Sequence, residues 1–165
     1  MKTLRLNPNQ IITLNDYPVH SSKVLTEYFA KCKSGKMLPL IPVMEKSIVR
    51  RYFGARLSKK FEEFETAHPK ARYFMLDGSH RTTALTLACQ HIQAVVYEEE
   101  EDIVKAKELS AKGQIRKSGT LNMTLEENCE TLNAHFKEKP YFMTVEQKTQ
   151  KMIKERKLPK SIKVK

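Results

Sequence analysis

The sequence predicts an α/β (α+β) fold, with a small mixed sheet and helices over residues 1–112 and a basic helical extension over residues 113–165. Short runs of β-branched and aromatic residues alternate with segments whose apolar residues recur every three or four positions. This pattern is typical of strands that alternate with helices. A short polar segment between Gly113 and Gly119 is expected to separate the two parts.

The size and composition of the chain fit one domain with a modest appendage. The chain has 165 residues, of which 40% are hydrophobic, and this is enough for a core. Its apolar runs are too short to span a membrane, and its first residues lack the apolar centre of a signal peptide. Three cysteines without CxxC spacing predict reduced thiols in a cytoplasmic protein with no membrane partner.

Four segments are predicted to be strands because they are short, apolar and rich in β-branched or aromatic residues. They are residues 11–14, 38–44, 73–76 and 93–97. Pro39 and Pro42 interrupt the second segment, and a proline has no N–H to donate to a neighbouring strand. We therefore expect residues 38–44 to form an edge strand, or a strand with an irregular start.

Helices are predicted between these strands. Ser21 is placed to cap a helix that Gly35 ends, and residues 46–70 have the apolar spacing of one or two further helices. A helix is also expected after the acidic run at residues 98–102, because acidic side chains favour the positive N-terminal end of a helix. That run is more simply a solvated helix start than a metal site.

Two late helices are predicted to begin with a capping box, in which a hydroxyl and a carboxylate or amide three residues later satisfy each other's backbone N–H groups. The boxes are Thr124 with Glu127 and Thr144 with Gln147. Pro159 is expected to end the second helix, and residues 160–165 to form a loose tail.

The segment whose residues most clearly suggest a binding or catalytic site is Asp77-Gly78-Ser79-His80-Arg81, between a predicted strand and a predicted helix. Glycine lets a ligand approach the backbone, and the first N–H groups of the helix favour an anion. Ser79 adds a hydroxyl, and Arg81 adds a planar guanidinium that suits phosphate oxygens. Asp77 could hold Mg²⁺ or accept a proton, and His80 could donate to phosphate. An equally open interpretation is a simple turn that Asp77 and Ser79 cap, with His80 and Arg81 on the surface.

The order of these segments resembles the ParB/sulfiredoxin-like domain family. The residues that carry the resemblance are 38–43, 73–85 and 93–97: a proline-entered strand, a strand that leads into a Gly-x-basic-Arg helix start, and a valine-rich strand. The resemblance covers about residues 10–112 and implies phosphate recognition at that helix N-terminus. Relative to compact members of the family, residues 46–70 would be a helical insertion.

The branches of that family differ at the turn. Sulfiredoxins need a cysteine where this chain has Ser79, which disfavours repair of oxidised peroxiredoxin. Partition proteins carry Gly-Glu-Arg-Arg and continue into a helix-turn-helix, which the sequence after Gly119 does not indicate. The free serine kinase branch carries Asp-Gly-His-His-Arg, and residues 77–81 are most similar to that motif.

The resemblance implies a nucleotide-binding protein that is a Mg²⁺-dependent nucleoside-triphosphate hydrolase or a small-molecule phosphotransferase, with ATP or CTP as the nucleotide. Asp77 would hold the metal, and Asp77 and His80 would be catalytic. The phosphate contacts would come from Gly78, Ser79, His80, Arg81 and Thr82. We expect a solvated Arg81, so that Arg81→Ala weakens triphosphate binding and leaves the fold nearly intact. His20 would reach the same helix N-terminus as an outer neighbour of the site.

The charge of the chain supports an alternative function. Lys and Arg number 30 against 19 Asp and Glu, a formal net charge of +11, and beyond His135 ten basic residues face three acids. Such an excess favours an anionic partner. The alternative is a DNA-binding protein of partition-like, mobile-element or nuclease-like type without turnover. Its phosphate-facing residues would be Lys148, Lys151, Lys154, Arg156 and Lys157. The simpler interpretation of that helix is a solvated basic helix that packs through Val145, Met152 and Ile153.

Overall fold

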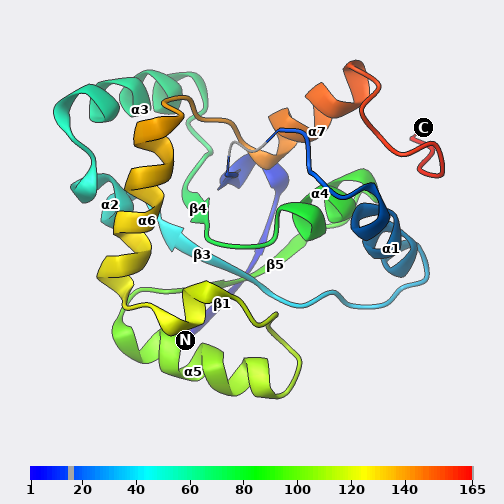
Figure 1. The fold of residues 1–165 in the computed structure, drawn as a ribbon, viewed down its shortest axis with the longest axis horizontal. Coiled ribbons are helices and arrows are strands. Elements are labelled where there is room, and N and C mark those ends of the chain that lie inside the picture. The colour runs from blue at the N-terminus through cyan, green and yellow to red at the C-terminus, as the bar shows by residue number, and fades with distance from the viewer. Residues whose placement is uncertain (15–16, 165) are drawn as a thin grey trace.

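A five-stranded mixed sheet forms the centre of the computed structural model, which describes residues 1–14 and 17–164 (Figure 1). The strands are β1 (Lys2–Leu6), β2 (Ile11–Ile12), β3 (Ile41–Glu45), β4 (Tyr73–Met75) and β5 (Ile92–Val96), in the order β1-β5-β3-β4-β2. Two pairs, β1–β5 and β3–β4, are antiparallel, and two pairs, β3–β5 and β2–β4, are parallel. The sheet and the helices around it confirm the predicted α/β class.

Helices cover both faces of the sheet. They are α1 (Ser22–Lys33), α2 (Lys46–Val49), α3 (Ala55–Ala67), α4 (Ser79–Leu87), α5 (Glu100–Ala111), α6 (Leu125–Glu138) and α7 (Val145–Lys154). Figure 1 shows α2, α3 and α6 on one side of the molecule and α1, α4 and α7 on the other. Within residues 1–14 and 17–164, no helix has the length and apolar character needed to cross a membrane.

Each face of the sheet has its own apolar core, because successive strand residues point to opposite faces. Met44 and Phe74 belong to the core that α3 and α6 cover, whereas their neighbours Val43 and Met75 belong to the core that α4 and α7 cover. A third apolar cluster joins α1, α4 and α7. The fold therefore places α4 directly on the sheet, with α1 and α7 packed against it.

Strand β3 lies in the middle of the sheet, so the expected edge position is wrong. The strand begins only at Ile41, which agrees with the alternative of an irregular start. Pro42 accepts a hydrogen bond from the N–H of Leu76 at 2.9 Å but has no N–H to return. The regular pairing with β4 therefore begins at Val43. Because Pro42 has no N–H, one backbone hydrogen bond is missing from the sheet, just beyond the end of β4.

Strand β1 was not among the predicted strands. Only Leu4 and Leu6 are apolar in Lys2–Leu6, and only Leu6 is buried. The segment pairs with β5 along its whole length, so its strand state comes from a distant partner rather than from its own composition. The only sequence pattern that could have indicated this strand is the alternation of Leu4 and Leu6 with polar residues.

The helix predictions that depend on local signals are confirmed. The Ser21 hydroxyl accepts a hydrogen bond from the N–H of Val24 at 3.2 Å and caps α1. Residues 46–70 contain α2, a short 3-10 turn and α3. Both capping boxes are present, at the starts of α6 and α7. The acidic run opens α5, where the Asp102 carboxylate accepts hydrogen bonds from the backbone N–H groups of Glu98 and Glu99.

Residues 113–165 share the core of residues 1–112. Cys129, Leu132 and Phe136 of α6 are buried in the same apolar cluster as Phe74 of β4. Strand β2 also forms a bridge with Thr144, directly before α7. The expected extension is therefore an integral part of the sheet packing.

The segment after α7 is anchored, which corrects the expectation of a loose tail over the residues that the structure describes. Ile162 is only 6% exposed and packs with Leu25 and Phe29 of α1. Beside it, the hydroxyls of Ser161 and Thr26 lie 3.3 Å apart. One buried isoleucine is enough to hold an otherwise basic segment on α1.

Candidate functional site

The connection from β4 to α4 needs a glycine. Gly78 has φ = +116°, in the left-handed region that side chains rarely adopt. A Cβ at this position would lie 2.5 Å from Ile41 Cδ1 of β3 and 3.3 Å from a guanidinium nitrogen of Arg81. The start of α4 can therefore approach β3 this closely only without a side chain.

The N-terminus of α4 carries no side-chain cap, since its N-cap residue is Gly78. The first N–H groups of a helix have no acceptor within the helix, and their partial positive charge favours an anion. At this end of α4 lies a cavity of about 380 Å³. Four parts of the chain line it: Leu14, Val19, His20, Val24, Tyr28, Asp77, Gly78, Ser79, His80, Arg81, Arg116, Lys117 and Ser118.

The lining of the cavity combines cationic and apolar side chains. The basic side chains in its lining are His20, His80, Arg81, Arg116 and Lys117, and the hydroxyls are those of Ser79 and Ser118. Asp77 is the one carboxylate among the lining residues that the structure describes. The apolar side chains are those of Leu14, Val19, Val24 and Tyr28. The charge balance suits an anion, and the apolar side chains suit an uncharged ring or chain attached to it.

Most of the residues that the sequence indicated meet at this cavity. Asp77, Gly78, Ser79, His80 and Arg81 all line it. His20, expected as an outer neighbour, lines it as well. The turn and the segment before α1 are therefore brought together as the sequence predicted.

Arg81 is buried, which corrects the expectation of a solvated guanidinium. Its side chain is 1% exposed. Nη1 donates to the carbonyls of Pro39 and Leu40 at 3.1 and 3.0 Å, and Nη2 pairs with Asp77 Oδ2 at 2.8 Å. Burial lowers the pKa of Arg81, and the charge of Asp77 acts in the opposite direction. Arg81 therefore ties the turn to the segment that enters β3.

One polar group of Arg81 remains unsatisfied. Its Nε is buried and has no hydrogen-bond partner among residues 1–14 and 17–164. A buried N–H without an acceptor costs about 1–3 kcal/mol. Arg81 lines the cavity, but Nε itself is covered by protein atoms.

Thr82 lies outside the cavity lining, which corrects its expected phosphate contact. The side chain is 1% exposed, and Oγ1 donates to the carbonyl of Gly78 at 2.9 Å. A threonine inside a helix commonly returns its hydroxyl to the carbonyl four residues earlier. The hydroxyl is therefore already used within α4.

His80 is held by the start of α1. Its Nε2 accepts a hydrogen bond from the N–H of Ser21 at 3.2 Å. A ring nitrogen that accepts carries no proton, so the proton of the neutral ring is assigned to Nδ1. The ring also meets His20 edge to face, with the centroids 4.7 Å apart.

The surroundings of His80 favour its neutral form. Burial is the main reason why its pKa lies below the ordinary value of 6.5. Three nearby basic side chains lower the pKa further, while Asp77 raises it; the basic side chains are His20, Lys148 and Arg116. An anion in the cavity would oppose the effect of the three basic side chains on the pKa of His80 and would add to the effect of Asp77. It would therefore favour the protonated ring.

The segment Arg116-Lys117-Ser118 is the part of the site that the sequence did not indicate. It follows a bridge between Ile115 and Leu40, and the N–H of Leu40 donates to the carbonyl of Gln114 at 2.8 Å. This contact joins two segments that are far apart in the chain. No local pattern could have placed Arg116 at the cavity, because the polar segment at residues 113–119 takes its position from its contact with Leu40, directly before β3.

The site does not fit a resident Mg²⁺ ion. The described residues contain no group of three or more His, Cys, Asp or Glu side chains that could hold a metal. Asp77, the predicted ligand, already pairs with Arg81 through Oδ2. Mg²⁺ prefers several oxygen ligands, and here the neighbouring side chains are cations that would repel it. We therefore derive no step through a metal.

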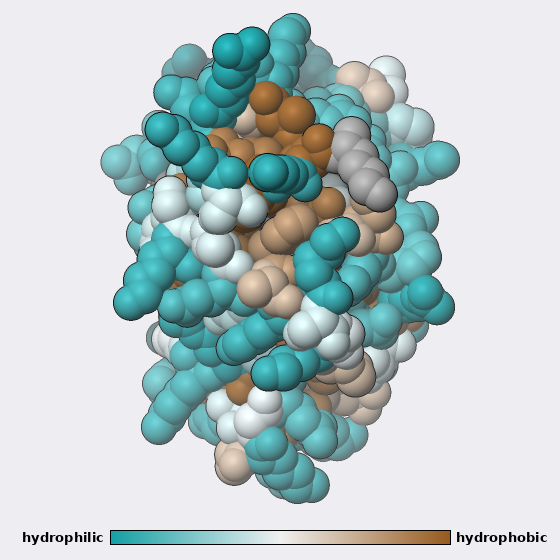
Figure 2. Space-filling model, turned by 90° about the vertical axis from the view of Figure 1, so that its right-hand side faces the viewer, coloured by the Kyte–Doolittle hydropathy of each residue, from teal (hydrophilic) through white to brown (hydrophobic). Residues whose placement is uncertain are grey.

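Four of the five residues predicted to contact nucleic acid lie on the surface. Lys151, Lys154, Arg156 and Lys157 are exposed on the last turn of α7 and just after it. The Lys151 ammonium lies 4.5 Å from the centroid of the Tyr17 ring. Figure 2 shows hydrophilic side chains over most of the face that carries α1 and α7.

Lys148 is not part of that surface, which corrects its predicted role. It is 1% exposed, because it lies three residues after Val145 and four before Met152, on the buried face of α7. Ile153, expected to pack inward, is 39% exposed instead. The buried face of α7 thus contains a lysine whose charge acts on His80.

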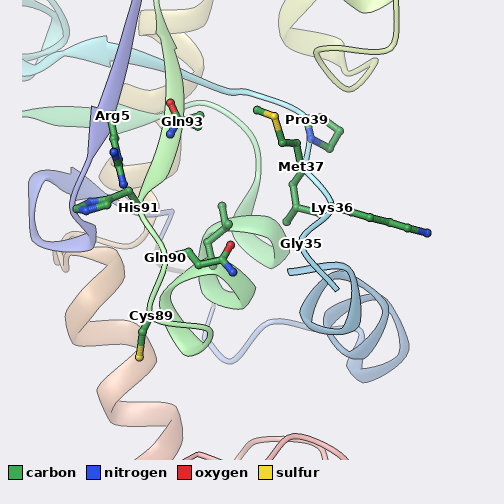
Figure 3. A pocket seen from close by; sticks show the side chains of 11 residues that line it. Arg5, Gly35, Lys36, Met37, Pro39, Cys89, Gln90, His91 and Gln93 are labelled. Atoms are coloured by element: carbon green, nitrogen blue, oxygen red, sulfur yellow. The ribbon is translucent and has the colours of Figure 1, made fainter. Parts of the chain in front are cut away.

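Two other cavities are larger but hold none of the predicted site residues. One, of about 500 Å³, lies beside β1 and β5 and is shown in Figure 3. There the Cys89 side chain points away from Arg5, His91 and Gln93, so these groups do not converge. The other, of about 640 Å³, lies between α3 and α6. The cavity between α3 and α6 also borders a helix start without a side-chain cap, at Gly54, and carries Arg56, Lys60 and Lys137. The cavity at α4 differs because it holds the turn at residues 77–81, with the buried Arg81, together with His20.

Comparison of the chain with protein-family models, with curated proteins and with solved structures gives no match. The resemblance to the ParB/sulfiredoxin-like family therefore stays a prediction from sequence. The function must be argued from the site itself.

Proposed function

We propose that the protein binds a nucleotide in the cavity at the N-terminus of α4. The observation that carries this proposal is a cavity of about 380 Å³ whose lining combines the uncapped N-terminus of α4 with His80, Arg116 and several apolar side chains. Ligand cavities of a few hundred Å³ with a mixed lining are typical of small-molecule sites.

The phosphate end of the nucleotide would lie at the start of α4. Its oxygens would accept from the first N–H groups of the helix and from the Ser79 hydroxyl. The Nδ1–H of His80 would add a further donor. Gly78 contributes by letting the start of α4 lie close to β3, because a Cβ there would be 2.5 Å from Ile41 Cδ1.

The base and sugar would lie against the apolar side chains of the lining. Val24 and Tyr28 are one helical turn apart on α1, and both line the cavity together with Leu14 and Val19. An aromatic ring beside aliphatic side chains is a surface on which a nucleobase can stack. These apolar side chains favour a nucleotide over an inorganic anion alone.

Transfer or hydrolysis of the terminal phosphate is the reaction that such a site would serve. Phosphoryl transfer depends mainly on positioning and on neutralising charge, and this cavity concentrates positive charge. His80 is the proposed hydrogen-bond donor to a phosphate oxygen, through its Nδ1–H. Asp77 is a weaker candidate for the base, because its Oδ2 is already engaged by Arg81 Nη2 at 2.8 Å.

The proposal is tested by a thermal-shift panel with ATP, CTP, GTP and ADP, each with and without Mg²⁺. A ligand present at a hundred times its dissociation constant adds about 2.7 kcal/mol of stability. No shift with any nucleotide would contradict the proposal. A shift with ATP or CTP alone would also identify the base that the apolar side chains accept.

A charge placed at the first residue of α4 gives a sharper test. Ser79→Asp should stabilise the free protein by about 0.3–1 kcal/mol, because the carboxylate interacts with the helix N-terminus. The same carboxylate should abolish the nucleotide-induced shift. Ser22→Asp, at the equivalent first residue of α1, is the matched control: it should stabilise similarly and leave the nucleotide shift unchanged.

Nucleic-acid binding is a second candidate function, favoured by the anchored basic segment after α7. Ile162 holds this segment on α1, so its lysines occupy fixed positions on the surface. Replacing Lys154, Lys157 and Lys160 by Ala should weaken retention of mixed-sequence duplex DNA and reduce its salt dependence, since each lost phosphate contact lowers the slope by about 0.9. Replacing the exposed Lys105, Lys107 and Lys112 of α5 and its C-terminus is the charge-matched control. Equal retention by both variants would contradict this function.

A further inference from the structure

We propose that Arg116, Lys117 and Ser118 form a second phosphoryl subsite, so that the ligand is a diphosphate or triphosphate whose charge is neutralised by protein side chains without a bridging metal. This inference rests on the proposed function and specifies its ligand class. The first phosphoryl group would occupy the N-terminus of α4, and the next would face the segment 116–118.

The position of the segment supports this assignment. Arg116, Lys117 and Ser118 line the same cavity as the start of α4 although they belong to the connection between α5 and α6. The bridge between Ile115 and Leu40 fixes the segment beside the entrance to β3. The two groups of donors therefore face one cavity from different elements, which suits a ligand with more than one anionic group.

The positive charges around the cavity also support a ligand with more than one anionic group. Arg116 is close enough to His80 and Arg81 that its charge lowers the pKa of both. These cations repel one another in the free protein, and Asp77 is the only carboxylate in the described lining that offsets them. A single dianionic phosphate would leave much of this repulsion in place, whereas a diphosphate would relieve it.

A buried donor provides an independent sign of a missing ligand. Arg81 Nε has no partner within the described residues, although the other guanidinium nitrogens are satisfied by two carbonyls and a carboxylate. Arg81 lines the cavity together with the start of α4 and the segment 116–118, whereas Nε itself is covered by protein atoms. An oxygen of a bound phosphoryl group would complete its hydrogen bonding after a small shift of the atoms that cover it.

The donor set also explains why a metal is unnecessary. Where Mg²⁺ assists a polyphosphate, it is held by carboxylates and bridges phosphate oxygens. Here the one available carboxylate is paired with Arg81, and the positions that would face the second phosphoryl group carry Arg116 and Lys117. A guanidinium can bridge two phosphate oxygens in a planar, bidentate contact.

Isothermal titration of the full chain with pyrophosphate and with inorganic phosphate, both in EDTA, tests this inference. Pyrophosphate should bind in EDTA at least as tightly as in excess Mg²⁺. Arg116→Ala should weaken pyrophosphate binding roughly 10- to 100-fold and phosphate binding less than about 3-fold, because a charge-assisted contact is lost only in the second subsite. Lys117→Ala should show the same selectivity with a smaller effect.

The control is Arg56→Ala, which removes an exposed arginine at the cavity between α3 and α6 and should leave both affinities unchanged. Equal loss of phosphate and pyrophosphate affinity in Arg116→Ala would overturn the second subsite. A strict requirement for Mg²⁺ would overturn the metal-free neutralisation. If neither anion and no nucleotide binds the parent chain, the proposed function itself fails, and that result differs from both of the others.

Discussion

The helices α4 and α7 begin in opposite ways, although they pack against each other. At α7 the Thr144 hydroxyl accepts from the N–H of Gln147 at 3.1 Å, and the Gln147 side chain accepts from the N–H of Thr144 at 2.9 Å. At α4 the corresponding position is Gly78, which has no side chain to offer. At the start of α7, neighbouring side chains therefore accept and complete backbone hydrogen bonds. At the start of α4, the first backbone N–H groups have no such side-chain acceptor and border a cavity.

The two helix starts differ in where their first N–H groups find acceptors. A capping box supplies two of these hydrogen bonds locally. At α4 the uncapped end borders a cavity with cationic side chains, and glycine is required there by the approach to Ile41. A missing cap alone does not mark a site, because α3 also begins at an uncapped glycine, Gly54.

Arg81→Ala should give the largest loss of stability, about 3 kcal/mol in urea unfolding. The substitution removes the partners of two carbonyls and leaves Asp77 without its counter-charge. Arg72→Ala is the control, since its 3.6 Å contact with Glu45 is largely exposed and should contribute less than about 1 kcal/mol. An unchanged unfolding free energy in Arg81→Ala would show that the guanidinium is not structural and would restore the original expectation.

Gly78→Ala should cost about 1–3 kcal/mol, because the new Cβ would meet Ile41 Cδ1 at 2.5 Å and φ is positive. Gly54→Ala compares directly, since Gly54 is the N-cap of α3, has φ = −69° and has open space around it. That change should stay within about 1 kcal/mol. If the two glycines tolerate alanine equally in thermal unfolding, the close approach of α4 to β3 is not as described.

Thr124→Ala should cost about 1 kcal/mol through loss of the α6 cap and should not change nucleotide affinity. Thr124→Ser keeps the hydroxyl and should retain most of the stability. Urea unfolding and the thermal-shift assay together test both parts of this prediction. A change in nucleotide affinity would mean that the capped and uncapped helix ends are not independent.

The smallest effect concerns pH. The folded state lowers the pKa of His80 below its ordinary value of 6.5, so the unfolded chain binds this proton more readily. The contribution of His80 to stability is therefore complete above pH 6.5 and is lost as the pH falls through the folded-state pKa. Melting temperatures at pH 7.5 and 5.5 should show a smaller drop for His80→Gln than for the parent chain. An equal drop would mean that His80 titrates freely.

The parts of the fold that the sequence predicted depend on neighbours within a few residues. The capping boxes, the Ser21 cap and the strand before Asp77 are local patterns, and all are present. Residues 77–81 were singled out as a turn that could bind phosphate, since a glycine between a strand and a helix is visible in the chain. They line the cavity, and their phosphate contact stays a prediction.

The rest of the site depends on contacts between distant segments. Arg116 reaches the cavity through the bridge between Ile115 and Leu40, and Arg81 is buried by carbonyls that lie about 40 residues earlier. The same applies to β3, whose central position is set by β4 and β5 and not by its two prolines. Sequence periodicity carries no information about such partners.

The cysteine at the far end of α4 makes the helix accessible to labelling. Of the three cysteines in the sequence, all within the described ranges, Cys89 alone is exposed, whereas Cys32 and Cys129 are buried. Cys89 follows the last turn of α4, a helix of 9 residues that spans about 14 Å. A thiol-reactive fluorophore attached there would report on the opposite end of the same helix without any substitution in the chain.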